Sequence, residues 1–132
     1  MIETPSDAPR SASPDGLPPF RCEVLYAEDH AVVTAFGEVD LATAPAVQRE
    51  AFATLALPIS RITVDFTGVT FLDSSALNML VRVQRRAAER SIGFDLAGLS
   101  ERARELLRIT GLSQMLGVVE PRRGDEPGPE RR

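Results

Sequence analysis

The chain has 132 residues, of which 43% are hydrophobic, and a formal net charge of −4. This length fits one domain with a buried core and is too short for two ordinary domains. The acidic balance and the complete absence of lysine argue against a nucleic-acid partner, because duplex binding depends on clustered cations.

Few chemical sites are compatible with the composition. Cys22 is the single cysteine and His30 the single histidine, so an intramolecular disulfide and a multi-histidine metal site are excluded, and we expect no metal or cofactor. No apolar run approaches the roughly 18 residues that a membrane helix requires, and no secretory signal is visible. We therefore expect a cytoplasmic protein without membrane insertion.

The two ends of the sequence differ in composition from its middle. Residues 1–19 are rich in Pro, Ser and Asp, and residues 121–132 are charged and interrupted by Pro and Gly. Segments of this kind bury too little apolar surface to offset the entropy lost on ordering. We expect disordered tails at 1–19 and 121–132 and one folded domain at 20–120.

The first half of that domain predicts a hairpin followed by a helix. Residues 20–27 and 31–40 are apolar and β-branched runs separated by a short polar turn, which is typical of two antiparallel strands. Residues 41–57 follow with apolar side chains at helical spacing. Thr43 is the expected N-cap, and Pro58 ends the helix.

The second half alternates between strand and helix patterns. It predicts a strand at 61–66, a connection at 67–72, a helix at about 74–90, a strand at 92–99, a helix at 100–110 and a last strand at 115–121. Alternation of this kind favours parallel pairing with helices packed on the sheet. The expected fold class is α/β, with a mixed sheet of about five strands and about three helices.

The junction between strand and helix at residues 71–77, FLDSSAL, carries an acid and two hydroxyls. Such residues at a helix start usually accept hydrogen bonds from free backbone amides, so Asp73 or Ser74 is expected to cap the helix. A helical wheel places Ser75 in the polar sector, near Met79 and Arg82, and we expect its side chain to be exposed.

A serine hydrolase is one alternative interpretation of these hydroxyls. A nucleophilic serine requires a positioned base, and His30 lies in the predicted first turn. Neither Ser74 nor Ser75 is surrounded by the GxSxG motif of a nucleophile elbow. We therefore expect that the protein is not an enzyme.

Three motifs resemble those of STAS domains, particularly bacterial anti-sigma factor antagonists. They are GEVD at 37–40, DFTGVTFLDSSAL at 65–77 and LLRITGL at 106–112, and the resemblance covers nearly all of residues 20–120. It implies a STAS-like fold and phosphorylation of Ser75 by a partner kinase that is also an anti-sigma factor. The unphosphorylated protein would bind this kinase and free the sigma factor, and a serine phosphatase would reset the switch.

The resemblance and the wheel together predict a partner-binding face. This face comprises Ser75, Asn78, Met79 and Arg82, and Glu38 and Asp40 are expected to form a second patch. A glycine often follows the serines in the family, whereas this chain has Ala76, whose side chain could tighten the helix start or reduce access for the kinase. The alternative is an adaptor that uses the same face without phosphorylation. The oligomeric state stays open.

Overall fold

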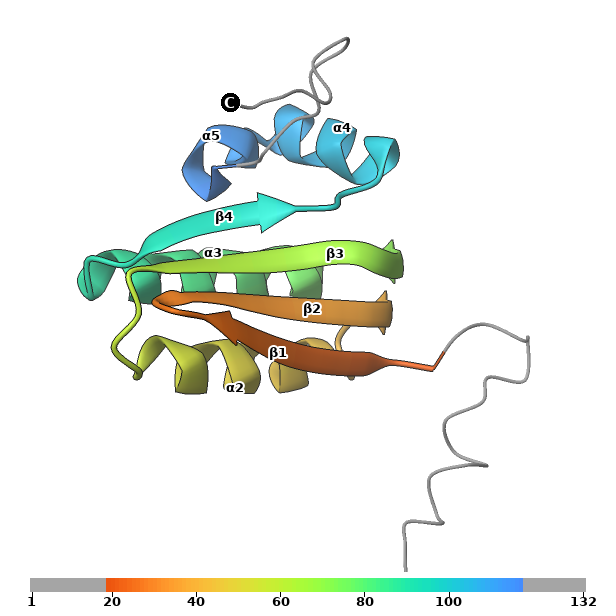
Figure 1. Cartoon of the computed structure of the whole chain (residues 1–132). Helices are drawn as coiled ribbons and strands as arrows, with labels where there is room; N and C mark the ends of the chain where they lie inside the picture. The colour runs from red at the N-terminus through yellow and green to blue at the C-terminus, as the bar shows by residue number, and fades with distance from the viewer. Residues whose placement is uncertain (1–18, 118–132) are drawn as a thin grey trace, which may run out of the picture.

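Residues 19–117 are described by a computed structural model, and they form one mixed sheet with helices packed beside it (Figure 1). The elements in chain order are β1 (Arg21–Ala27), β2 (His30–Val39), α2 (Ala44–Leu55), β3 (Arg61–Leu72), α3 (Ser74–Glu89), β4 (Gly93–Ala97), α4 (Glu101–Thr110) and α5 (Leu112–Leu116). Within these residues no helix is long and apolar enough to cross a membrane.

The sheet has the strand order β1-β2-β3-β4. Its first pair is antiparallel, which confirms the predicted hairpin, and β2 with β3 and β3 with β4 are parallel. The tight turn at residues 28–29 includes Glu28 at a φ of 59°. Val39 pairs with Leu72, so β2 and β3 end side by side. The loops that follow these two strands therefore leave the sheet at the same edge.

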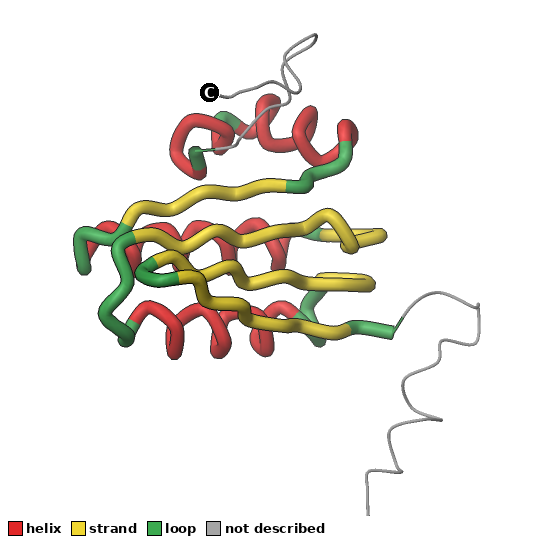
Figure 2. The backbone as a smooth tube through the Cα atoms, viewed as in Figure 1, coloured by secondary structure: helices red, strands yellow, loops and turns green. Residues whose placement is uncertain are grey.

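Helices α2 and α3 lie side by side on one face of the sheet, as Figures 1 and 2 show. Burial alternates strictly along β2, where Ala31, Val33, Ala35 and Val39 are fully buried. This period of two turns one side of the strand toward the helices. Helices α4 and α5 lie beyond β4, so the opposite face of the sheet carries no helix among the described residues (Figure 1).

The α/β class is confirmed, but the predicted last strand at 115–121 is wrong. The described residues form four strands and four helices, not about five strands and three helices. Residues 112–116 form α5 between Gly111 and Gly117, which both have positive φ. Leu112 and Leu116 are four residues apart and pack against the core, a helical spacing that outweighs the strand-like composition. Residues 118–121 lie outside the described part of the chain, as do the predicted tails except Pro19.

The predicted connection at 67–72 is a continuation of β3. Beyond Asp65 this strand keeps pairing with β2 through two register shifts. Near the first shift, the Asp65 carboxylate accepts the Thr67 amide at 2.8 Å. Gly68 admits the Phe36 ring, because a Cβ there would lie 2.4 Å from Phe36 Cδ2. The register shifts bend β3 after its buried section, and the strand continues to Leu72.

Cys22 on β1 is half-buried and faces α2. Burial raises the pKa of its thiol to about 11, with smaller contributions from the Glu50 and Glu23 carboxylates. The thiolate is the reactive species. The shift from 9.0 to about 11 lowers the thiolate fraction at pH 8, and it predicts that the native thiol reacts at least about tenfold more slowly with Ellman's reagent than the unfolded chain does. Equal rates in native buffer and in denaturant would contradict this prediction.

Candidate functional site

The start of α3 is fixed by Asp73, which lies in extended backbone directly after β3. Its Oδ1 accepts the Ser75 amide at 2.8 Å and the Ala76 amide at 3.3 Å. The structure thus assigns the cap to Asp73, while Ser74 is the first residue of the helix itself. Capping fixes the direction in which α3 leaves the sheet, and with it the position of both serines.

The exposures of the two serines differ from what the helical wheel predicts for Ser75. Ser74 is exposed, whereas Ser75 is only half-exposed, so the expectation of a fully exposed Ser75 is wrong. The prediction from the helical wheel assumed that α3 is buried only where it packs on the sheet. In the structure α2 lies beside α3, and Ser75 faces a groove between the two helices.

This groove, the Ser75 groove, has a volume of about 480 Å³. Its lining residues are Leu41, Ala44, Pro45, Gln48, Arg49, Ser75, Asn78, Met79 and Arg82. Arg82 donates a hydrogen bond to Gln48 Oε1 at 3.2 Å, which ties α3 to α2. Two arginines and no acidic residue line the groove, so its walls combine apolar surface with positive charge.

Met79 does not belong to an exposed partner-binding face. Only 1% of its surface is exposed, and it is part of the hydrophobic core between the helices. It lies one helical turn after Ser75, on the side of α3 that α2 covers. Met79 therefore forms the floor of the Ser75 groove, while Asn78 and Arg82 are exposed as expected.

Glu38 and Asp40 lie beside the start of α3, because the Asp73 amide donates to the Val39 carbonyl at 3.4 Å. The Asp40 carboxylate binds the loop that follows β2: its Oδ1 accepts the amides of Ala42 and Thr43 at 3.0 and 3.2 Å. The Thr43 hydroxyl donates to the Glu38 carbonyl at 2.7 Å. Neither carboxylate lines the Ser75 groove, and Asp40 holds the loop in shape.

The residue that sequence reasoning missed is Leu41. It is 77% exposed at the rim of the groove, where the Asp40 turn holds its backbone. The sequence contained a signal for this role. Leu41 stands between Asp40 and the expected cap Thr43, and residues before a helix cap usually lie outside the helix, so an apolar side chain there is not buried by the helix. The helical segment predicted at 41–57 included this leucine and gave it no role of its own.

Ala76 is fully buried in the core. Its side chain points away from the solvent through which another protein would reach Ser75. Ala76 therefore adds no exposed surface beside Ser75, and alanine favours the helix over glycine by about 1 kcal/mol.

A serine–histidine pair is absent from the described residues. The imidazole Nε2 of His30 lies 2.8 Å from Thr63 Oγ1, at the start of β2. Both serines follow the far end of β3, which runs parallel to β2. The length of the sheet separates the base from either hydroxyl. Residues 19–117 also contain no cluster of three or more His, Cys, Asp or Glu side chains suited to a metal ion.

Residues 23–119 match the family model described as "Mlab, STAS domain". The chain belongs to the STAS domain family. It is 31% identical over 90 residues to an anti-sigma-B factor antagonist of Listeria monocytogenes, a match covering 68% of this chain and 79% of that protein. It is also 33% identical over 70 residues to a STAS-domain containing protein of Pseudomonas aeruginosa, covering 53% and 69% of the two chains.

Solved structures agree with this assignment. An anti-sigma factor antagonist from Mycobacterium paratuberculosis has a TM-score of 0.69 at 25% identity, over 83% of this STAS domain chain and 91% of that one. Unphosphorylated SpoIIAA, also an anti-sigma factor antagonist, has a TM-score of 0.60 at 16% identity, over 78% and 89% of the two chains. The second likeness supports the fold alone.

The cap gives a first prediction for the site. Asp73→Ala removes the acceptor of two helix amides and should lower the free energy of unfolding by about 1 kcal/mol. Asp73→Asn keeps an acceptor and should stay close to the native value, as should Ser74→Ala. Urea unfolding followed by circular dichroism measures all three. An Asp73→Asn loss as large as that of Asp73→Ala would show that charge, not capping, is the stabilising feature.

Proposed function

We propose that this STAS domain is an anti-sigma factor antagonist that acts by binding and has no catalytic activity. In this proposal it binds an anti-sigma factor kinase through the Ser75 groove, and phosphorylation of Ser75 ends the binding. The observation that carries the proposal is the placement of a half-exposed serine hydroxyl at the rim of a concave surface between two helices. The relatives named as anti-sigma factor antagonists support the class of partner.

The groove has the features of a small protein-binding surface. Leu41 presents an exposed apolar side chain at its rim, and Arg82 and Arg49 add cations. Buried apolar anchors and arginines carry most of the binding energy in protein interfaces. A partner that inserts beside Leu41 comes into direct contact with Ser75.

A phosphate on Ser75 would change this surface in charge and in size. It adds about −1.5 to −2 charges at pH 7. Closing the partner over the groove would then require desolvation of a dianion, which costs several kcal/mol beyond what Arg49 and Arg82 offset. Since each 1.4 kcal/mol is about tenfold in affinity, this cost is sufficient to release the partner.

The switch predicts opposite effects for two substitutions of one residue. Ser75→Ala should keep native affinity for the kinase, while Ser75→Asp should bind at least about tenfold more weakly. Isothermal titration calorimetry with an anti-sigma factor kinase encoded in the same genome measures both affinities. Ser74→Asp is the matched control, since it places the same charge one residue away on the exposed side. Equal affinities of Ser75→Ala and Ser75→Asp would overturn the switch.

Phosphorylation itself is tested by incubating the protein with that kinase and ATP and mapping the modified residue by mass spectrometry. We expect one phosphate on Ser75, retained in Ser74→Ala and lost in Ser75→Ala. Kinase binding without any modification would favour the second candidate function, a phosphorylation-independent adaptor. The half-buried position of Ser75 is the observation that favours this candidate, because it narrows the approach of a kinase to the hydroxyl.

The role of the rim is tested at Leu41. Leu41→Ala should weaken kinase binding by about 1 kcal/mol or more, because an apolar anchor is truncated, and should leave folding stability unchanged. Leu57→Ala is the control, because Leu57 is also exposed but follows the other end of α2. A loss at Leu57 equal to that at Leu41 would place the interface elsewhere.

A further inference from the structure

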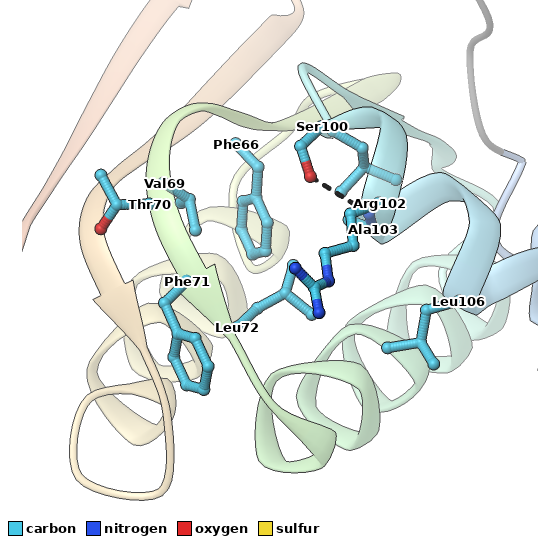
Figure 3. Close-up of a pocket in the computed structure, with 10 residues that line it drawn as sticks. Phe66, Val69, Thr70, Phe71, Leu72, Ser100, Arg102, Ala103 and Leu106 are labelled. Carbon is cyan, nitrogen blue, oxygen red and sulfur yellow. Dashed lines mark hydrogen bonds between the residues drawn. The ribbon is translucent and has the colours of Figure 1, made fainter.

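A second groove lies on the other side of the strand that leads to Ser75. It separates the end of β3 from the start of α4 and has a volume of about 530 Å³ (Figure 3). Small-molecule sites commonly have volumes of roughly 300–1,000 Å³ and mostly apolar walls. This α4 groove therefore has the size of a ligand site, and nothing in the proposed antagonist function uses it.

Most of the walls of the α4 groove are apolar. They include Val69, Phe71 and Leu72 on the strand side and Leu99 and Leu106 on the helix side. Phe71 is 52% exposed and Leu106 39% exposed. Because these two side chains stay in contact with water, an apolar ligand laid between them would gain by removing that surface from solvent.

The lining of the α4 groove also contains one positive charge. Arg102 turns its guanidinium into the groove beside Leu72 (Figure 3), and it makes no ion pair within the described residues. None of the residues that line the groove is acidic. The Arg102 guanidinium is therefore available to bind an anion in this mostly apolar groove.

The start of α4 adds a hydrogen-bond donor to the lining of the groove. Ser100 caps the helix by accepting the Ala103 amide at 3.1 Å. This bond uses the serine oxygen as acceptor, so the hydroxyl hydrogen is available to a second acceptor. The positive end of the ten-residue helix reinforces the preference for negative charge.

We propose that the α4 groove binds a free medium-chain fatty carboxylate. The acyl chain lies along the apolar lining that includes Phe71 and Leu106, and the carboxylate accepts hydrogen bonds from Arg102 and Ser100. A bidentate guanidinium–carboxylate pair matches the geometry of the two groups. The inference goes beyond the antagonist function and does not depend on phosphorylation of Ser75.

Titration of the ¹⁵N-labelled full chain with sodium dodecanoate, below its critical micelle concentration, tests the proposal by NMR. We expect saturable shifts confined to the amides of residues 66–72 and 99–106. Arg102→Gln should bind about fivefold more weakly. Arg108→Gln is the matched control: it removes the same charge from the same helix, but Arg108 pairs with Glu105 outside the groove, and its affinity should equal the native value.

Three further measurements can overturn the proposal. Dodecyltrimethylammonium should not bind; an affinity equal to that of dodecanoate would remove the role of Arg102. Dilution without ligand should leave the groove amides unshifted; shifts on dilution would assign the groove to a second copy of the chain. Sedimentation with anionic phospholipid vesicles should leave the protein in solution, and Arg102-dependent sedimentation would assign the groove to a membrane lipid.

Discussion

The parallel pairing of β2 with β3 up to their last residues is the constraint on which the site depends. Val39 pairs with Leu72, and each of the two strands is followed at once by an aspartate. Asp73 uses its carboxylate to cap α3, and Asp40 uses its own to hold the turn before α2. The two loops are therefore fixed beside each other. This geometry places Leu41 and Ser75, 34 positions apart in the sequence, on one groove.

Packing between α2 and α3 then determines which side chains of α3 remain accessible. A helix on a sheet has one buried side, but α3 contacts both the sheet and α2. The second contact buries Met79 and half-buries Ser75. Arg86 is affected in the same way: its guanidinium stacks 4.1 Å from the centre of the Phe52 ring on α2. Met79, Ser75 and Arg86 thus lie at the interface between α2 and α3, while Asn78 and Arg82 remain exposed at the surface.

The sequence predicted what depends on local periodicity and missed what depends on neighbours. The hairpin, the helix at 74–89 and the choice of Asp73 or Ser74 as a cap follow from spacing and residue type over a few positions. Met79 could not be assigned in this way, because its burial requires the position of α2. Residues 115 and 116 were assigned to a strand instead of to α5, because a five-residue helix contains too little periodicity to separate it from a strand. The α4 groove could not be predicted for a related reason. Phe71 and Arg102 are far apart in the sequence, and β4 brings α4 beside the end of β3.

The cap also limits where a charge added to Ser75 can be stabilised. Free amides at a helix start attract anions, and a phosphate at such a position would ordinarily bind them. Here the amides of Ser75 and Ala76 already donate to Asp73, so a phosphate on Ser75 would have to displace a carboxylate or stay beside it. The phosphate would then find few free amides to bind at the helix start. It would instead project into the Ser75 groove, where Arg82 is held by Gln48 and where the proposed partner would make contact. The position of Asp73 thus favours a switch that acts on the interface rather than on the stability of α3.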